Sequence, residues 1–139
     1  MILKTDAIIS VVDDEESVRN SMRRLLRSMG FEVRVFHSAR DFLHQGPLHE
    51  DGCVIVDVRM PEMNGLDLQK RLSDAGISLP LIFITAYEDP GVCEQAMQNG
   101  AVAFMQKPFS DQCLMDAIHL ALERNNQQTG DRREVCRQG

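Results

Sequence analysis

Several features that would place this sequence in other classes of protein are missing from it. No apolar run approaches the roughly 18 residues that a membrane-spanning helix needs, so the sequence predicts no membrane-embedded segment. The opening residues, MILKTDAIIS, lack a charged start, a long apolar stretch and a small-residue cleavage site, so they do not resemble a secretory signal. We therefore expect a cytoplasmic protein.

Cysteine pairs and an excess of positive charge are missing as well. The four cysteines are scattered without a C-x-x-C pair, and the four histidines do not stand at the spacing of metal ligands. The sequence therefore predicts no zinc site, and we expect the cysteines to be reduced thiols. The formal net charge is −6, which argues against nucleic-acid binding by the folded domain.

What the sequence does contain is a regular alternation of predicted strands and helices. Its 139 residues are 43% hydrophobic and 26% charged, which are ordinary values for one globular domain. Five short apolar segments predict strands at 7–12, 31–36, 53–56, 81–84 and 102–105. Apolar residues at helical spacing and helix-capping signals predict a helix after each strand, at 18–29, 38–43, 65–75, 90–99 and 110–123.

The strand patterns predict an α/β fold with a doubly wound, five-stranded parallel sheet and five helices. Segment 7–12 is continuously apolar, as in a strand buried on both faces, whereas 31–36 alternates, as in a half-exposed edge strand. Right-handed crossovers then build a three-layer sandwich. An edge position for the second strand favours the order 2-1-3-4-5, which resembles that of flavodoxin and CheY. The domain is expected to cover 1–124, and the polar segment 125–139 is predicted to be a disordered tail or linker.

Side chains that carry a carboxylate, a hydroxyl or an ammonium group stand at the ends of four of the predicted strands. Asp13 and Asp14 follow the first strand, and Asp57 follows the third. Thr85 ends the fourth strand, and Lys107 follows the fifth. Each residue type alone is common at such a position. Because open α/β sheets build their sites at the carboxyl ends of the strands, we expect all of these side chains to converge.

The expected cluster suits a magnesium ion and a phosphoryl group. Two carboxylates about 4 Å apart repel by about 4 kcal/mol at an effective dielectric constant of about 20, so three of them call for a nearby cation. Mg²⁺ binds through one or two carboxylates together with phosphate oxygens, which predicts a metal site at Asp13 and Asp14. Asp57 is then a candidate nucleophile toward an activated phosphorus. Thr85 and Lys107 are candidates to stabilise the transferred oxygens.

Three other functions share parts of this pattern. A small-molecule phosphatase of the haloacid dehalogenase type would carry a D-x-D motif after its first strand, where Asp13 and Asp14 are adjacent instead. A flavin-binding module would need a loop rich in Ser, Thr and Gly at the same place, where DDEES stands. An interaction scaffold without phosphoryl chemistry would not need the complete set of site residues.

Four motifs give the sequence its resemblance to a known family. VVDDEESVR, VIVDVRMPEMNGLDL, IFITAY and AFMQKPF, in this order, resemble the receiver domain of two-component response regulators over about 5–124. The resemblance implies a phosphoacceptor signalling domain rather than a conventional enzyme, with Asp57 phosphorylated by a sensor histidine kinase. It also implies that Asp13 and Asp14 hold Mg²⁺ with the backbone carbonyl of Arg59.

The same resemblance assigns roles to residues beyond the metal site. It implies that Thr85 and Lys107 contact the phosphoryl group, with a cis bond between Lys107 and Pro108. The switch aromatic of the family falls on Phe104, which has no hydroxyl, so we expect switching to depend on its burial. Tyr87 and the side chain of Arg59 are expected to screen the acyl phosphate from water and set its lifetime.

The stretch SVRNSMRRLLRSMGFEVRVFHSARDFL, together with Phe104, is similar to the FixJ-type subgroup of receivers. Members of this subgroup usually carry a C-terminal helix-turn-helix domain that binds DNA. The resemblance therefore implies homodimerisation on phosphorylation, or control of such an output domain in a longer protein, through the last helices and strand. The alternative is a stand-alone receiver that acts as a phosphate shuttle or adaptor.

Overall fold

Five parallel strands form one sheet in the order β2-β1-β3-β4-β5, as the sequence predicts. The structure is a computed structural model that describes residues 7–48 and 51–130. The strands are β1 (Ile8–Val12), β2 (Glu32–Phe36), β3 (Gly52–Asp57), β4 (Leu81–Thr85) and β5 (Ala103–Gln106). The helices are α1 (Glu16–Ser28), α2 (Ala39–Gln45), α3 (Gly65–Asp74), α4 (Pro90–Gln98) and α5 (Asp111–Gly130).

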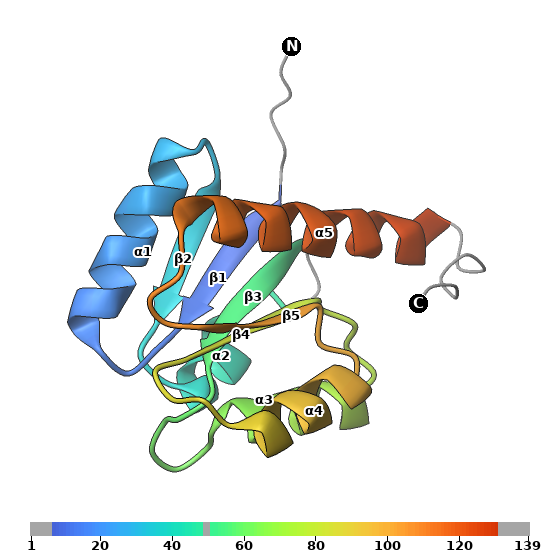
Figure 1. Cartoon of the computed structure of the whole chain (residues 1–139). Coiled ribbons are helices and arrows are strands. Elements are labelled where there is room, and N and C mark those ends of the chain that lie inside the picture. Colours follow the sequence, from blue (N-terminus) through green and yellow to red (C-terminus); the bar gives the residue numbers. More distant parts are fainter. Residues whose placement is uncertain (1–6, 49–50, 131–139) are drawn as a thin grey trace.

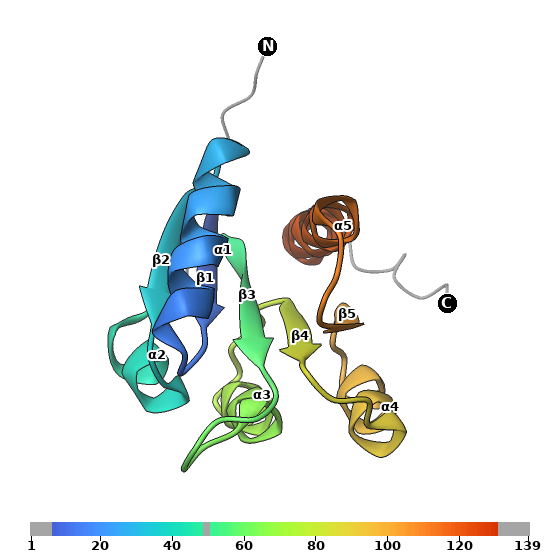
Figure 2. The ribbon, with the colours of Figure 1, turned by 60° about the vertical axis from the view of Figure 1, so that its left-hand side comes forward.

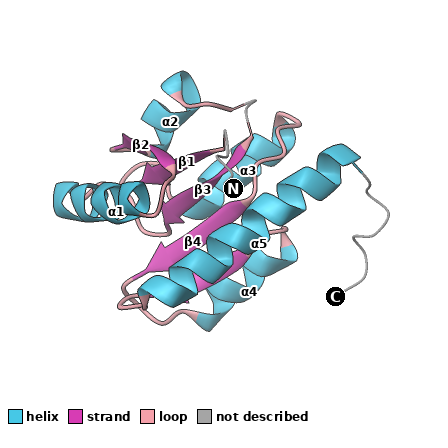
Figure 3. Ribbon diagram, turned by 90° about the horizontal axis from the view of Figure 1, so that it is seen from above, coloured by secondary structure: helices cyan, strands magenta, loops and turns pink. Residues whose placement is uncertain are grey.

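The helices cover the sheet on both sides and make a three-layer sandwich (Figures 1 and 2). Helices α1 and α5 lie on one face, where α1 contacts β1 and β2 and α5 contacts β3 and β4 (Figure 3). Helices α2, α3 and α4 lie on the other face. Each face has its own apolar core; Leu26 and Ile118 are fully buried in one, and Phe42 and Leu68 in the other. The two cores fix the central strands between them.

Burial along the strands follows the apolar pattern of the sequence. All residues of β1 and β3 are buried, because both strands have neighbours on each side and helices on each face. Strand β2 alternates between exposed and half-buried positions up to its buried last residue and lies at an edge, which confirms the prediction made from 31–36. Strands β3 and β4 extend beyond their predicted apolar segments to include Asp57 and Thr85. The sheet ladder itself therefore holds the backbones of these two residues.

Side-chain caps start four of the helices where the sequence indicates, and at α5 the Ser110 hydroxyl accepts a hydrogen bond from the Cys113 backbone N–H at 3.0 Å. The Ser38 hydroxyl accepts a hydrogen bond from the Asp41 backbone N–H at 3.0 Å, and α2 continues to Gln45, past its predicted end near residue 43. Asn64 begins α3 in a reciprocal capping box with Asp67. Asp89 caps α4 ahead of a proline at its first position.

Helix α5 is longer than its apolar stripe. The sequence predicts a tail from residue 125, but α5 runs to Gly130, so this prediction is wrong for 125–130. Apolar spacing marks only the turns of a helix that pack on a sheet, and the last turns of α5 extend past the sheet (Figure 1). Residues 131–139 lie outside the described residues. No helix within the described ranges is long and apolar enough to cross a bilayer.

The cysteines among the described residues are free thiols. Cys53 is fully buried in β3, and this burial raises the pKa of its thiol to about 12. The thiol therefore stays protonated at neutral pH. Cys93 on α4 is half-buried and Cys113 on α5 is exposed. Cys136 lies outside the described residues.

Candidate functional site

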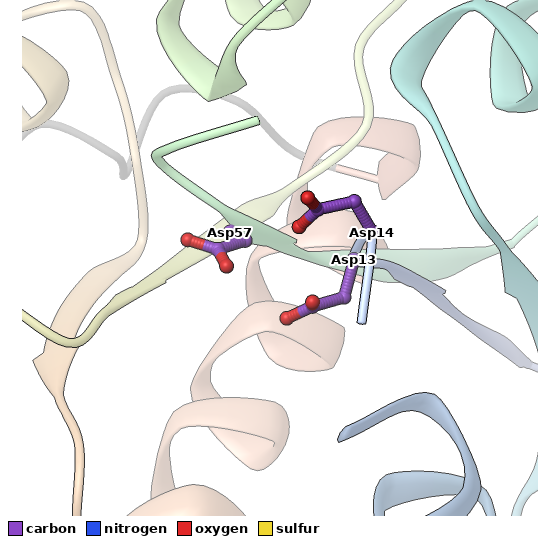
Figure 4. Close-up of side chains that lie close together, drawn as sticks. All are labelled: Asp13, Asp14 and Asp57. Carbon is purple, nitrogen blue, oxygen red and sulfur yellow. The ribbon is translucent and has the colours of Figure 1, made fainter. Parts of the chain in front are cut away.

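Three carboxylates gather where β1 and β3 end. These strands are neighbours in register, with Val12 opposite Val56, so the residues that follow them emerge side by side. Asp13, Asp14 and Asp57 each have an oxygen within 4.8 Å of an oxygen of the other two (Figure 4). Within the described residues this is the one cluster of acidic, histidine or cysteine side chains that could hold a metal ion.

Asp13 is the most enclosed of the three carboxylates. Its residue is 0% exposed, because β1 delivers it to the floor of the site. Its Oδ1 accepts a hydrogen bond from the Glu15 backbone N–H at 2.9 Å. Its Oδ2 has no hydrogen-bond partner among the described residues. A buried carboxylate oxygen without a partner is costly, and a bound cation would satisfy it.

Lys107 supplies the positive charge that faces this cluster. Its Nζ lies 3.7 Å from Asp13 Oδ2 and 3.8 Å from Asp57 Oδ2, with a quarter of the side chain exposed. Its backbone N–H donates to the Thr85 carbonyl oxygen at 2.7 Å, which extends the β4–β5 ladder to the site. The Lys107–Pro108 bond is cis, as the family resemblance implies. One ammonium thus faces two of the three carboxylates, and its single charge can offset only one of them.

Burial shifts the titration of the enclosed carboxyls. It raises the pKa of Asp13 from 3.8 to about 6, and repulsion from Asp57 and Asp14 adds to this. The Glu15 N–H and Lys107 pull the pKa of Asp13 in the opposite direction. Burial likewise raises the pKa of Asp57, against hydrogen bonding from a backbone N–H and the attraction of Lys107. The protein alone leaves this site short of positive charge.

The donor set fits Mg²⁺. The oxygens are hard ligands, they lie close together, and Asp13 Oδ2 accepts no hydrogen bond among the described residues. Asp14, whose residue is exposed, keeps the site open to water, which Mg²⁺ retains in its coordination shell. The Arg59 backbone N–H donates to Asp57 Oδ1 at 3.1 Å, which brings the loop after β3 against the acidic cluster.

Thr85 lies on the far side of Asp57 from Asp13, at the end of β4. Its residue is 1% exposed, and its hydroxyl accepts a hydrogen bond from the Tyr87 backbone N–H at 3.2 Å. Phe104 pairs with Phe83 in the β4–β5 register, and their ring centroids lie 6.1 Å apart. Because side chains two apart on a strand share a face, Thr85 and Phe104 lie on the same side of the sheet.

Arg59 and Tyr87 form a stacked pair at the rim of the site. The Arg59 guanidinium carbon lies 5.0 Å from the centre of the Tyr87 ring, and Tyr87 is 61% exposed. The Arg59 guanidinium also pairs with Asp89 Oδ2 at 3.4 Å. From the sequence, Asp89 is visible only as a helix cap, because its other partner is far away along the chain.

Gly65 approaches the acceptor strand closely, although the sequence identifies it only as a helix start. A Cβ at this residue would lie 2.9 Å from the Asp57 backbone oxygen and 2.9 Å from Phe83 Cε1. Its N–H donates to the Val58 carbonyl oxygen at 3.0 Å, which closes the loop between β3 and α3. The Asn-Gly dipeptide that precedes α3 was the available signal for this close approach.

Comparison with known proteins gives one consistent family. A family model described as "Response regulator receiver domain" matches residues 9–119. The transcriptional regulatory protein TdiR of Thauera aromatica is 45% identical over 126 residues, which are 91% of this chain and 56% of TdiR. The transcriptional regulatory protein FixJ of Rhizobium meliloti is 41% identical over 119 residues, 86% of this chain and 58% of FixJ.

Solved structures agree with this result. The crystal structure of FixJ-N matches with a TM-score of 0.80 and 40% identity, and the match covers 86% of this chain and 95% of that one. The response regulator StyR matches with a TM-score of 0.84 and 42% identity, over 90% of this chain and 63% of that one. The chain spans little more than half the length of the curated relatives that it matches.

Proposed function

Because this chain belongs to the response regulator receiver domain family of two-component systems, we propose that Asp57 accepts a phosphoryl group from a sensor histidine kinase. One observation carries the proposal. The Asp57 carboxylate ends a central strand, 3.8 Å from the Lys107 ammonium and beside two further carboxylates that suit a divalent cation. Nucleophile, positive charge and metal ligands therefore share one small volume.

In the proposed transfer, an oxygen of ionised Asp57 attacks the phosphorus of a phosphohistidine. A P–O bond forms, the P–N bond breaks, and the imidazole nitrogen leaves with the electron pair and takes up a proton. The raised pKa of Asp57 opposes this step, because only the carboxylate is nucleophilic. The nearby Lys107 ammonium favours the carboxylate and, after transfer, would contact the phosphoryl oxygens.

We assign the metal site to Asp13, Asp14 and Asp57, with the Arg59 backbone carbonyl as a further ligand. When bound there, Mg²⁺ supplies positive charge that offsets the repulsion between the carboxylates and the incoming phosphoryl oxygens. The buried Oδ2 of Asp13, which accepts no hydrogen bond among the described residues, supports this assignment. The chain's own residues orient the acceptor, since the Arg59 N–H already holds Asp57 Oδ1. Beyond transfer, the domain is proposed to assist only the loss of its own phosphoryl group.

The response to phosphorylation is proposed to pass through Thr85 and Phe104. The Thr85 hydroxyl accepts a hydrogen bond from the Tyr87 backbone N–H and still has a proton to donate. Thr85 can therefore turn toward a phosphoryl oxygen. Movement of Thr85 would open space on the face of the sheet that it shares with Phe104. Phe104 is half-buried, so turning further inward would bury more of its ring. The surface of α4, β5 and α5 would change in consequence.

The changed surface is proposed to control homodimerisation or a DNA-binding output domain in a longer protein. Relatives named as transcriptional regulatory proteins, roughly twice as long as the matched segment, support this proposal. The domain itself is not proposed to bind nucleic acid or membrane, given its net charge of −6, and its proposed location is the cytoplasm. A stand-alone receiver that shuttles phosphate is the alternative.

Phosphorylation by a small acyl phosphate tests the acceptor directly. The protein is incubated with acetyl phosphate and Mg²⁺, and its intact mass and hydrodynamic size are measured. We expect wild type to gain the mass of one phosphoryl group and Asp57→Asn to gain none. Asp51→Asn is the matched control, because Asp51 is exposed just before β3 begins. It should behave as wild type.

Two outcomes would contradict the proposal. Wild-type protein that never gains mass, with EDTA and Mg²⁺ giving the same result, would end the assignment of a phosphoacceptor. If Asp57→Asn gains as much phosphoryl mass as wild type, the acceptor must be another residue. A change of size in wild type but not in Asp57→Asn would further support dimerisation.

A further inference from the structure

Asp89 uses its two carboxylate oxygens for two different parts of the molecule. Oδ1 accepts a hydrogen bond from the Val92 backbone N–H at 3.3 Å and so caps the N-terminus of α4. Oδ2 pairs with the Arg59 guanidinium at 3.4 Å, across thirty positions of sequence. One side chain thus joins the start of α4 to the loop that follows the acceptor strand.

The partner of Asp89 is itself tied to the acceptor. The Arg59 backbone N–H donates to Asp57 Oδ1 at 3.1 Å, and its guanidinium lies over the Tyr87 ring. The Tyr87 backbone N–H in turn donates to the Thr85 hydroxyl. Both members of the stacked pair are therefore anchored by their own amides to residues of the phosphoryl site, while their side chains meet at its rim.

We propose that Asp89 is a positioning residue that holds the Arg59 guanidinium on the Tyr87 ring until a phosphoryl group on Asp57 draws it away. This inference rests on the proposed function, because the competing anion is the phosphoryl group. Neither the acceptor chemistry nor the switch through Thr85 gives a role to Asp89 or to its ion pair with Arg59.

Charge decides which anion Arg59 prefers. Asp89 offers a single negative charge at a site where both partners are partly exposed to water. A phosphoryl group carries about −1.5 to −2 charges and three acceptor oxygens, and arginine binds such a group through two parallel N–H donors. The Arg59 backbone N–H is already hydrogen-bonded to Asp57, so only the Arg59 side chain has to move for the guanidinium to reach the phosphoryl group. The guanidinium then leaves Asp89 and the Tyr87 ring together.

The transfer has a consequence for α4. Once Arg59 leaves, Asp89 remains as a helix cap through Oδ1 but no longer ties α4 to the loop after β3. The first turn of α4 thereby gains freedom to move. This is a second connection from the acceptor to α4, separate from the one through Thr85.

A single spectroscopic probe reports on the contact without any phosphoryl donor. Tyr87 is the only tyrosine of the chain and tryptophan is absent, so labelling tyrosine rings with ¹³C gives one ring environment to follow by NMR. Asp89→Asn removes the charge that holds Arg59 and keeps an amide oxygen to cap α4. We expect the Tyr87 ring signal to shift in this variant. Glu88→Gln is the matched control, because Glu88 is an exposed neighbour that has no ion pair within the described residues.

The lifetime of the acyl phosphate tests the competition itself. After phosphorylation with acetyl phosphate and Mg²⁺, the decay is followed by intact mass in wild type, Asp89→Asn, Arg59→Gln and the double variant. Releasing an exposed ion pair changes an equilibrium about 1.4- to 5-fold. We expect Asp89→Asn to lengthen the lifetime by such a factor, because Arg59 then covers the phosphoryl group more of the time. In the Arg59→Gln background the Asp89 substitution should have no effect.

Each outcome is decisive. An unchanged Tyr87 signal in Asp89→Asn would show that Asp89 does not hold the stacked pair and would overturn the inference. So would equal effects of Asp89→Asn with and without Arg59, since the change would then come from the charge of Asp89 alone. If wild type gains no phosphoryl mass, the proposed function fails, and so does the proposed movement of Arg59 from Asp89 to the phosphoryl group. The Tyr87 signal still decides whether Asp89 holds Arg59.

Discussion

Replacing Asp13 by asparagine should make the metal-free protein more stable at neutral pH. Asp13 is fully buried, and burial raises its pKa from 3.8 to about 6. The folded protein therefore keeps a proton on Asp13 at pH values where the unfolded chain has lost it. Because the folded state binds more protons in this range, the free energy of unfolding falls as the pH rises from about 4 to about 6.

The size of the effect follows from the same two pKa values. One pKa unit corresponds to about 1.4 kcal/mol, so the ionisation of Asp13 costs the folded state about 3 kcal/mol above pH 6. Asparagine retains an oxygen that can accept from the Glu15 N–H but carries no charge. In EDTA at pH 7, Asp13→Asn should therefore unfold at a higher urea concentration, with about 3 kcal/mol more free energy of unfolding.

The assay is urea unfolding of wild type and variant between pH 4 and pH 7.5, in EDTA and again in Mg²⁺. Wild type should lose stability toward neutral pH in EDTA, and Asp13→Asn should lose less. Mg²⁺ should stabilise wild type more than the variant, because binding to the folded state raises stability by mass action. Glu94→Gln is the charge-matched control, since Glu94 is exposed on α4 and has no ion pair within the described ranges.

The reasoning would be refuted by either of two results. A wild-type stability that stays level between pH 4 and pH 6 in EDTA would mean that burial does not hold a proton on Asp13. Destabilisation by Asp13→Asn at pH 7, with Glu94→Gln unchanged, would mean that the charged carboxylate is favourable as it stands, so that Lys107 compensates it fully.

The remaining predictions concern the loop, the counter-charge and the rim of the site. Gly65→Ala should lower the free energy of unfolding by about 1–3 kcal/mol in urea, because its Cβ would meet the Asp57 carbonyl oxygen and Phe83, and an unchanged midpoint would contradict this. Lys107→Met should destabilise the metal-free protein at pH 7 by about 3 kcal/mol, since it leaves two enclosed carboxylates without their cation; equal urea midpoints would disprove it. Tyr87→Ala should shorten the lifetime of the acyl phosphate in a mass-spectrometric time course, and equal decay would show that this ring does not limit the access of water.

Local sequence patterns were enough to predict most of the fold. Continuous apolar segments identified the buried strands, and the alternation in 31–36 placed β2 at an edge, because burial on one face or two leaves a direct mark on residue type. The same reasoning failed for 125–130, since a helix that leaves the sheet needs no apolar stripe. The strand order required the resemblance to known folds as well as the strand patterns.

The sequence by itself determined which residue types stand at the strand ends, because strand and helix periods are local properties of the chain. Asp13, Asp57 and Lys107 could be named as one site on that basis. Only the tertiary structure decided that Asp13 Oδ2 lacks a hydrogen-bond partner and that Arg59 meets Asp89. Charge interactions depend on distances of a few ångströms between segments far apart along the chain, and no local pattern encodes those distances.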